Sequence, residues 1–175
     1  IVIPDGGFFI GNCNSFKLND NFTIEGRKSI AINLAGDMLN IRFGHNDLIS
    51  YETFINDFSN LLNNLINRDI NIILVPHIYK DLEIINLVLR NVKEKYIREH
   101  IMIAPYLQGN TGMKYIFGIY NSVDLVLAMR FHANVCPIGL NIPTIGLSSY
   151  PQIERLYKEL NFEESYVNIN TYNFD

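Results

Sequence analysis

The feature that most constrains this chain is a regular alternation of short apolar runs with longer amphipathic segments, which starts at Lys28. Residues 29–35 (SIAINLA) are apolar enough for a buried strand, and residues 51–69 carry hydrophobic side chains at the spacing of one helical face. Such alternation is typical of strand–helix–strand units, which build parallel sheets. The sequence therefore predicts an α/β fold with a doubly wound, mostly parallel, Rossmann-like sheet of five to six strands.

The same pattern places the remaining elements. Further strands are predicted at 70–77, 100–106, 124–129 and 143–148, and further helices at 81–96, 113–123, 132–140 and 151–162. Residues 1–27 do not follow the alternation, so we interpret them as an irregular lead-in, either the tail of a preceding domain or a linker. Residues 28–175 are predicted to form one domain, because the 175-residue chain is 48% hydrophobic and long enough for one core.

Composition excludes several classes of protein. The net charge is -4, and the Lys and Arg residues do not gather into a basic stripe, so nucleic acid is not an expected partner. No apolar stretch reaches the roughly 20 residues needed to span a bilayer. Cys13 and Cys136 are far apart, which indicates neither a disulfide framework nor a zinc site. The opening residues do not resemble a signal peptide, and we expect the chain to be a domain of a longer protein.

Familiar catalytic motifs do not occur either. The segment after the first strand, INLAGDMLN, has a single glycine, so the dinucleotide-binding pattern GxGxxG fails. The chain also lacks a phosphate-binding GxxxxGK[ST] loop, a GxSxG nucleophile turn and an HExxH metal motif. The chemistry must therefore be sought in the polar residues at the strand ends.

Ligands of an open parallel sheet bind beyond the carboxyl ends of its strands. The polar side chains predicted at that edge are Asn33, His77, Gln108, Arg130, His132, Ser148 and Ser149. This set contains a guanidinium and two imidazoles but no carboxylate, so it favours an anionic ligand and no bound metal ion. Less specific interpretations stay open: Arg130 as an ion-pair residue, His132 as a donor to a nearby carbonyl, and His77 as a solvated turn residue.

With these residues in view, the sequence resembles the polysaccharide pyruvyl transferase family. The matching features are RxHA at 130–133, the segment G-x-x-[IV]-P-x-[IV]-G at 139–146, a closing helix that ends in Glu159-Leu160, and PDGGFFI at 4–10, which is similar to the family's PD-x-x-F segment. The resemblance implies one half of a two-domain architecture like that of B-type glycosyltransferases. This chain would be the C-terminal, donor-binding domain, and an N-terminal domain would precede it.

The resemblance also implies an activity. Members transfer a pyruvyl group from phosphoenolpyruvate to two hydroxyls of a sugar in a cell-surface polysaccharide, which forms a ketal and releases phosphate. Arg130 and His132 would be the donor-site and catalytic residues, with Arg130 holding the donor, and His77 is a looser match to the family. From their position at the strand ends, Asn33, Gln108, Ser148 and Ser149 are expected to contact the substrates as well. No cofactor is implied. The acceptor would be a saccharide, either free or linked to a lipid. The protein is expected in the cytoplasm, including the inner face of the membrane.

Two other functions remain open from the sequence. The first is a nucleotide-sugar glycosyltransferase of the same architecture. Such domains often have a Glu at this edge that binds the ribose hydroxyls, and the absence of any Glu between Glu99 and Glu154 argues against this function. A non-catalytic sugar-binding or interaction module is the other, because Gln152 stands where family members commonly have Lys, and the Thr111–Met113 segment lacks their usual acidic residue. Because a site between two domains needs both, the chain alone is expected to bind donor weakly without turnover.

Overall fold

The computed structural model describes residues 4–10, 26–43 and 50–171. Six strands form one sheet in the order β3-β2-β1-β4-β5-β6, and every neighbouring pair is parallel. The strands are β1 (Ser29–Asn33), β2 (Asn71–Leu74), β3 (Ile101–Ile103), β4 (Leu125–Ala128), β5 (Thr144–Ser148) and β6 (Tyr166–Asn168). This is the doubly wound α/β arrangement that the alternation predicts.

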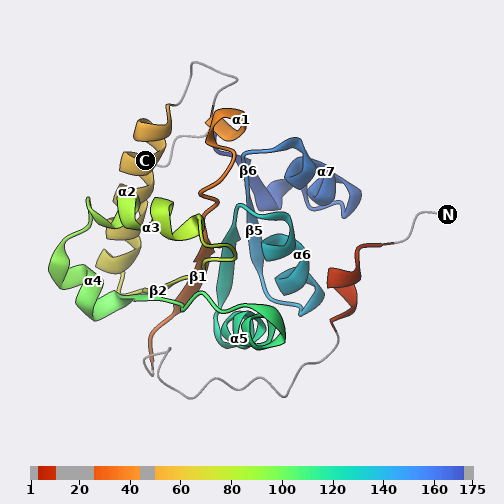
Figure 1. The fold of residues 1–175 in the computed structure, drawn as a ribbon, viewed down its shortest axis with the longest axis horizontal. Coiled ribbons are helices and arrows are strands. Elements are labelled where there is room, and N and C mark those ends of the chain that lie inside the picture. The colour runs from red at the N-terminus through yellow and green to blue at the C-terminus, as the bar shows by residue number, and fades with distance from the viewer. Residues whose placement is uncertain (1–3, 11–25, 44–49, 172–175) are drawn as a thin grey trace.

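Helices cover both faces of the sheet (Figure 1). On one face lie α2 (Tyr51–Asn67) and α3 (Asp81–Leu89), with α4 (Glu94–His100) beside them. On the other lie α5 (Gly109–Ser122) and α6 (Phe131–Gly139), and α7 (Pro151–Glu159) packs beside α6. The short elements are α1 (Leu39–Phe43), η1 (Gly6–Phe9) and η2 (Glu163–Ser165). With both faces covered, the central strands can be apolar throughout.

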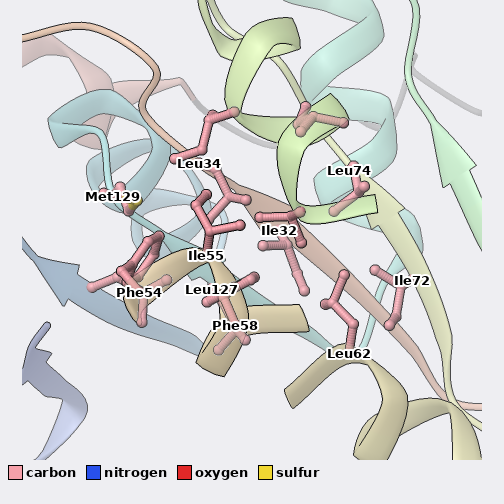
Figure 2. Packing of buried hydrophobic residues seen from close by; sticks show 14 of the residues in the cluster. Ile32, Leu34, Phe54, Ile55, Phe58, Leu62, Ile72, Leu74, Leu127 and Met129 are labelled. Atoms are coloured by element: carbon pink, nitrogen blue, oxygen red, sulfur yellow. The ribbon is translucent and has the colours of Figure 1, made fainter. Parts of the chain in front are cut away.

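Alternate residues of the central strands pack against opposite helices. Ile32 of β1 lies in the cluster with Phe54 and Phe58 of α2, whereas Ala31 lies with Ile119 of α5. Figure 2 shows the first cluster, in which side chains from β1, β2 and β4 meet those of α2. These two clusters fix the positions of the strand ends on which the site is built.

The single helix predicted at 81–96 is wrong, because the chain forms two helices there. α3 ends at Leu89 and α4 begins at Glu94, with Lys93 in an extended conformation between them. Val92 lies in this connection, with 7% of its surface exposed, and packs into the cluster beneath α2. The backbone N–H groups of Asn91 and Val92 bond to the carbonyls of Val88 and Leu89, three residues back, so the end of α3 tightens before the chain extends at Lys93.

The N-terminal segment folds onto α6. The side chain of Asp5 accepts a hydrogen bond from the backbone N–H of Gly7 (2.8 Å) and so caps η1. A Cβ at Gly139 would lie 2.9 Å from the carbonyl oxygen of Gly7, so glycine permits this close approach of η1 to the end of α6. Asp5 and Phe8 are thereby held beside α6, and residues 11–25 of the predicted lead-in lie outside the described part of the chain.

Candidate active site

The site lies where the strand order reverses, between β1 and β4, at the carboxyl ends of the strands. A cavity of about 400 Å³ opens there. Its lining residues are Asp37, Met38, Arg42, His77, Ile78, Met129, Arg130, Phe131, His132, Tyr150, Gln152 and Ile153. The cavity therefore brings together Arg130, His132 and His77, three of the residues that the sequence places at this edge.

A buried carboxylate anchors Arg130. Asp81, the first residue of α3, is fully buried and accepts hydrogen bonds from Nε (2.9 Å) and Nη2 of Arg130. It also accepts hydrogen bonds from the backbone N–H groups of Gly36, His77 and Ile78. One side chain thus ties the ends of β1 and β2 to the guanidinium that follows β4. This bidentate geometry fixes the plane of the guanidinium.

A second carboxylate joins Arg130 to another guanidinium. Asp37 Oδ1 lies 2.8 Å from Nη2 of Arg130 and 3.4 Å from Nη2 of Arg42. Arg42, on α1, also donates from Nε to the Asp37 carbonyl and from Nη1 to the hydroxyl of Ser149 (2.8 Å). Within the described residues, Nη1 of Arg130 makes no hydrogen bond, so this nitrogen is open to a ligand in the cavity.

The network shifts the pKa values of its members. Partial burial acts to raise the pKa of Asp37, but the hydrogen bond from Arg130 and the charges of Arg130 and Arg42 outweigh it, so the pKa lies below its ordinary value. Burial lowers the pKa of Arg42, whereas Asp81 and Asp37 together raise the pKa of Arg130 against the effect of burial. Asp37, Arg42 and Arg130 are therefore charged at neutral pH.

His77 presents a neutral ring to the cavity. Loss of solvent around the ring lowers its pKa to about 4; the charge of Asp81 opposes this shift, and those of Arg130 and His132 add to it. Its Nε2 lies 2.7 Å from the hydroxyl of Tyr120 on α5, whose own pKa is raised by complete burial. His77 is thus an uncharged hydrogen-bonding group at neutral pH, not a cation.

His132 differs from His77 in both exposure and neighbours. It lies in the first turn of α6, and 67% of its side chain is exposed. Its Nε2 is 3.8 Å from Oδ2 of Asp5. No side chain caps the N-terminus of α6, so its first backbone N–H groups add partial positive charge beside His132.

Two buried asparagines fix the backbone at Arg130. Asn33 is fully buried; its amide donates to the carbonyl of Val75 (2.9 Å), and its oxygen accepts from the backbone N–H of Arg130 (3.1 Å). Asn134 donates to the carbonyls of Ala128 and Arg130. Both the nitrogen and the oxygen of the Asn33 amide thus have partners within the fold, and its contact with a substrate stays a prediction.

The other predicted residues lie outside the cavity lining. Gln108 is exposed ahead of α5, where its amide lies 3.4 Å from the hydroxyl of Tyr106. Ser148 is buried and bonds to the carbonyl of Tyr150 (3.3 Å). Ser149 touches the site indirectly, through its hydrogen bond from Arg42. The structure thus gathers the charged candidates and places Gln108 and Ser148 apart from them.

The expectation that this edge lacks carboxylates is wrong, since Asp37 and Asp81 both lie there. Arg42 was also not predicted from the sequence as a site residue. Each of the three lies in a loop, a short helix or a helix start rather than directly at a predicted strand end. Among the described residues, no group of three or more His, Cys, Asp or Glu side chains could hold a metal ion. The two carboxylates serve as partners of guanidinium groups.

A comparison with protein families identifies the family of this chain. The family model described as polysaccharide pyruvyl transferase matches residues 1–150. The chain belongs to this family. The RxHA segment that suggested the family, at 130–133, thus lies within the matched region and carries Arg130 and His132 at the N-terminus of α6.

A solved structure supports the fold of this family member. The chain is similar to an ADP-heptose LPS heptosyltransferase II from E. coli, with a TM-score of 0.52 and 16% sequence identity. The match covers 84% of this chain and 38% of the heptosyltransferase chain, so the present chain corresponds to well under half of that B-type glycosyltransferase. At this identity the likeness concerns the fold alone. A search of curated proteins finds no match.

In the part of the chain that the structure describes, no helix is both long and apolar enough to cross a bilayer.

Proposed function

We propose that the cavity between β1 and β4 binds phosphoenolpyruvate and that its pyruvyl group passes to two hydroxyls of a saccharide. The observation that carries this proposal is the pair of guanidinium groups, Arg42 and Arg130, which Asp37 holds side by side in the lining of one cavity. Phosphoenolpyruvate has two anionic groups, a carboxylate and a phosphate. Two guanidinium groups and the uncapped start of α6 offer matching donors.

His132 is the acid and base of the proposed reaction. A protonated His132 gives its proton to C3 of phosphoenolpyruvate, which turns C3 into a methyl group and C2 into an oxocarbenium ion. One sugar hydroxyl adds to C2, and its proton returns to His132. The bond from C2 to the phosphate oxygen then breaks, the second hydroxyl takes its place, and the second proton leaves with inorganic phosphate. Imidazole suits both transfers because it exchanges protons near neutral pH.

The other residues have positioning or binding roles in this proposal. Arg130 Nη1 and Arg42 contact the anionic groups of the donor, and their charge also stabilises the phosphate as it leaves. His77 contributes a neutral hydrogen-bonding group that does not compete for the proton on His132. Asn33 and Ser149 act through Arg130 and Arg42 respectively. Gln108 and Ser148 remain predictions as substrate contacts, and the proposed location is the cytoplasm, where phosphoenolpyruvate is made.

Binding of the donor can be tested on the chain itself. Phosphoenolpyruvate should shift the amide resonances of residues 130–132 saturably, and Arg130→Ala should weaken binding by roughly tenfold or more, as expected for a lost hydrogen bond between charged groups. Arg90→Ala, at an exposed position on the far side of α3, should bind like the wild type. Shifts with ADP or UDP, but none with phosphoenolpyruvate, would replace this proposal with the glycosyltransferase that the fold also accommodates.

Catalysis is tested in the full-length protein that contains this chain. His132→Ala should lower kcat by about 10²- to 10⁴-fold with little change in melting temperature, because most of the side chain is exposed. Phosphate release from phosphoenolpyruvate in the presence of a saccharide is the readout. Equal losses of activity and stability would contradict the assignment of His132.

A further inference from the structure

A second cavity, of about 390 Å³, lies beside the first and shares Phe131 and Gln152 with it. Its walls come from the N-terminal segment with η1 and from α7. The lining residues are Pro4, Asp5, Phe8, Phe131, Gln152, Arg155, Leu156, Glu159 and Leu160. The shared residues place the two cavities next to each other, so a molecule that extends out of the donor cavity past Phe131 would reach the second one.

The chemistry of the two cavities differs. The first contains two guanidinium groups, two imidazoles and one carboxylate, Asp37, whereas the second contains one guanidinium, Arg155, and two carboxylates, Asp5 and Glu159. A second anion would therefore not be favoured there. Two aromatic rings, Phe8 and Phe131, add apolar wall area. Apolar rings beside carboxylate and amide groups suit a sugar, which has apolar C–H faces and hydroxyl edges, better than a purely apolar chain.

The two cavities meet next to the proposed acid and base. His132 lines the first cavity, and Asp5, whose carboxylate is 3.8 Å from the His132 Nε2, lines the second. An acceptor that enters from the second cavity would bring its hydroxyls past this imidazole toward a donor in the first. This is the approach that proton transfer from the attacking hydroxyl to His132 requires.

We propose that the second cavity, between η1 and α7, binds the sugar unit that adjoins the one receiving the pyruvyl group. This inference rests on the proposed function for the identity of the acceptor, a saccharide chain rather than a free monosaccharide. A polymeric acceptor has neighbouring units that must lie outside the donor cavity, and this cavity adjoins it at Phe131 and Gln152. Glu159 and Gln152 accept or donate hydrogen bonds to hydroxyl groups, and Phe131 contacts the sugar face at the junction.

The test uses saccharide probes whose binding is followed by amide resonances of η1 and α7. Lactose, cellobiose and maltose are compared with methyl β-galactoside, methyl β-glucoside and methyl α-glucoside at equal concentrations. At least one disaccharide should shift Phe8, Arg155 and Glu159 saturably and more than any monosaccharide does. Glu159→Gln should weaken that binding by about tenfold, through loss of a charged hydrogen-bond acceptor. Both Glu159 and Arg155 are exposed, so their variants should fold.

Lys158→Ala is the matched control, because Lys158 is exposed on the same helix and does not line the cavity. It should bind the probes like the wild type. The inference is overturned if no disaccharide shifts these resonances, if Glu159→Gln and Lys158→Ala have equal effects, or if octyl alcohol binds there and the saccharides do not. Failure of the proposed function gives a different result, because phosphoenolpyruvate then leaves the resonances of residues 130–132 unshifted. Disaccharide binding is measured separately, by the resonances of η1 and α7.

Discussion

The Asp81 carboxylate holds Arg130 from a position with no solvent exposure, through Nε and Nη2 of the guanidinium. The same carboxylate accepts hydrogen bonds from the backbone N–H groups of Gly36, His77 and Ile78. A buried carboxylate is costly unless it is paired and fully hydrogen-bonded, and Asp81 meets both conditions. It therefore couples the stability of the fold to the position of the arginine in the cavity.

Asp81→Asn should reveal this coupling in two measurements. The substitution keeps the shape but removes the charge and places an N–H₂ group where only acceptors fit. Urea denaturation should show a loss of roughly 3 kcal/mol in the free energy of unfolding, as for other broken buried ion pairs. Binding of phosphoenolpyruvate should weaken as well, because Arg130 loses its bidentate partner.

The control is Glu99→Gln, at an exposed carboxylate on α4. Its unfolding free energy should stay within about 0.5 kcal/mol of the wild type. If Asp81→Asn lost stability yet kept wild-type donor affinity, the carboxylate would be a folding element only and would not position Arg130.

The lowered pKa of His77 should make the stability of the fold depend on pH. Its folded-state pKa is about 4, below the ordinary value near 6.5 that it regains on unfolding. Between these values the unfolded chain binds more protons than the folded one, so stability is complete above about pH 6.5 and falls as the pH drops toward about 4. Urea denaturation between pH 4 and 7.5 measures this slope.

His77→Gln provides the comparison for that slope, because glutamine keeps a hydrogen-bonding side chain near Tyr120 but does not titrate. Its stability should vary less with pH between 6.5 and 4 than that of the wild type. Identical slopes in the two proteins, or a His77 imidazole resonance that titrates near pH 6.5, would contradict the burial argument.

Most of the sheet could be predicted from the sequence, because strands buried on both faces, such as β1 and β4, produce apolar runs that local composition reveals. The break between α3 and α4 could not. Val88 and Val92 are four residues apart, the spacing of one helical face, so the apolar pattern runs through the break without marking it. The hydrogen bond from Asn91, which lies at the break, to Asn56 of α2 depends on tertiary structure and leaves no signal in the local sequence.

The site was predicted in part for a related reason. Arg130 and His132 directly follow a strand, where sequence position alone implies a shared edge. Asp81 reads equally well as an ordinary first-turn carboxylate of α3, and its contact with Arg130, 49 residues away, exists only in three dimensions. Arg42 offered a weak signal: a single arginine within an apolar segment after the first strand.

Gly36 should not tolerate a side chain. A Cβ there would lie 2.0 Å from the carbonyl oxygen of Lys80, so the loop after β1 and the start of α3 would have to separate. Gly36→Ala should therefore destabilise the fold by about 3 kcal/mol, toward the upper end of the usual cost of overpacking. It should also weaken donor binding, because the Gly36 N–H is a partner of Asp81.

Thermal and urea denaturation of Gly36→Ala, beside Gly6→Ala, measure this effect. A Cβ at Gly6 would meet no atom within 4 Å, so that variant should lie within about 0.5 kcal/mol of the wild type. Equal stability of the two variants would show that the loop after β1 adjusts at no cost.

The hydroxyl of Tyr157 joins α7 to the site. It donates to Oδ1 of Asn134 (2.8 Å), whose amide nitrogen holds the carbonyls of Ala128 and Arg130, and both side chains are fully buried. Tyr157→Phe leaves Oδ1 of Asn134 without its donor, so urea denaturation should show a loss of about 1–3 kcal/mol.

The matched control is Tyr166→Phe, which removes a hydroxyl that makes no hydrogen bond to the described residues and should change stability by less than about 0.5 kcal/mol. Because α7 carries Arg155 and Glu159, loosening its contact with α6 should also weaken disaccharide binding in the second cavity, while phosphoenolpyruvate binding changes less. If Tyr157→Phe weakened donor binding more than disaccharide binding, the hydroxyl would act chiefly through Arg130, and α7 would hold its place through apolar contacts alone.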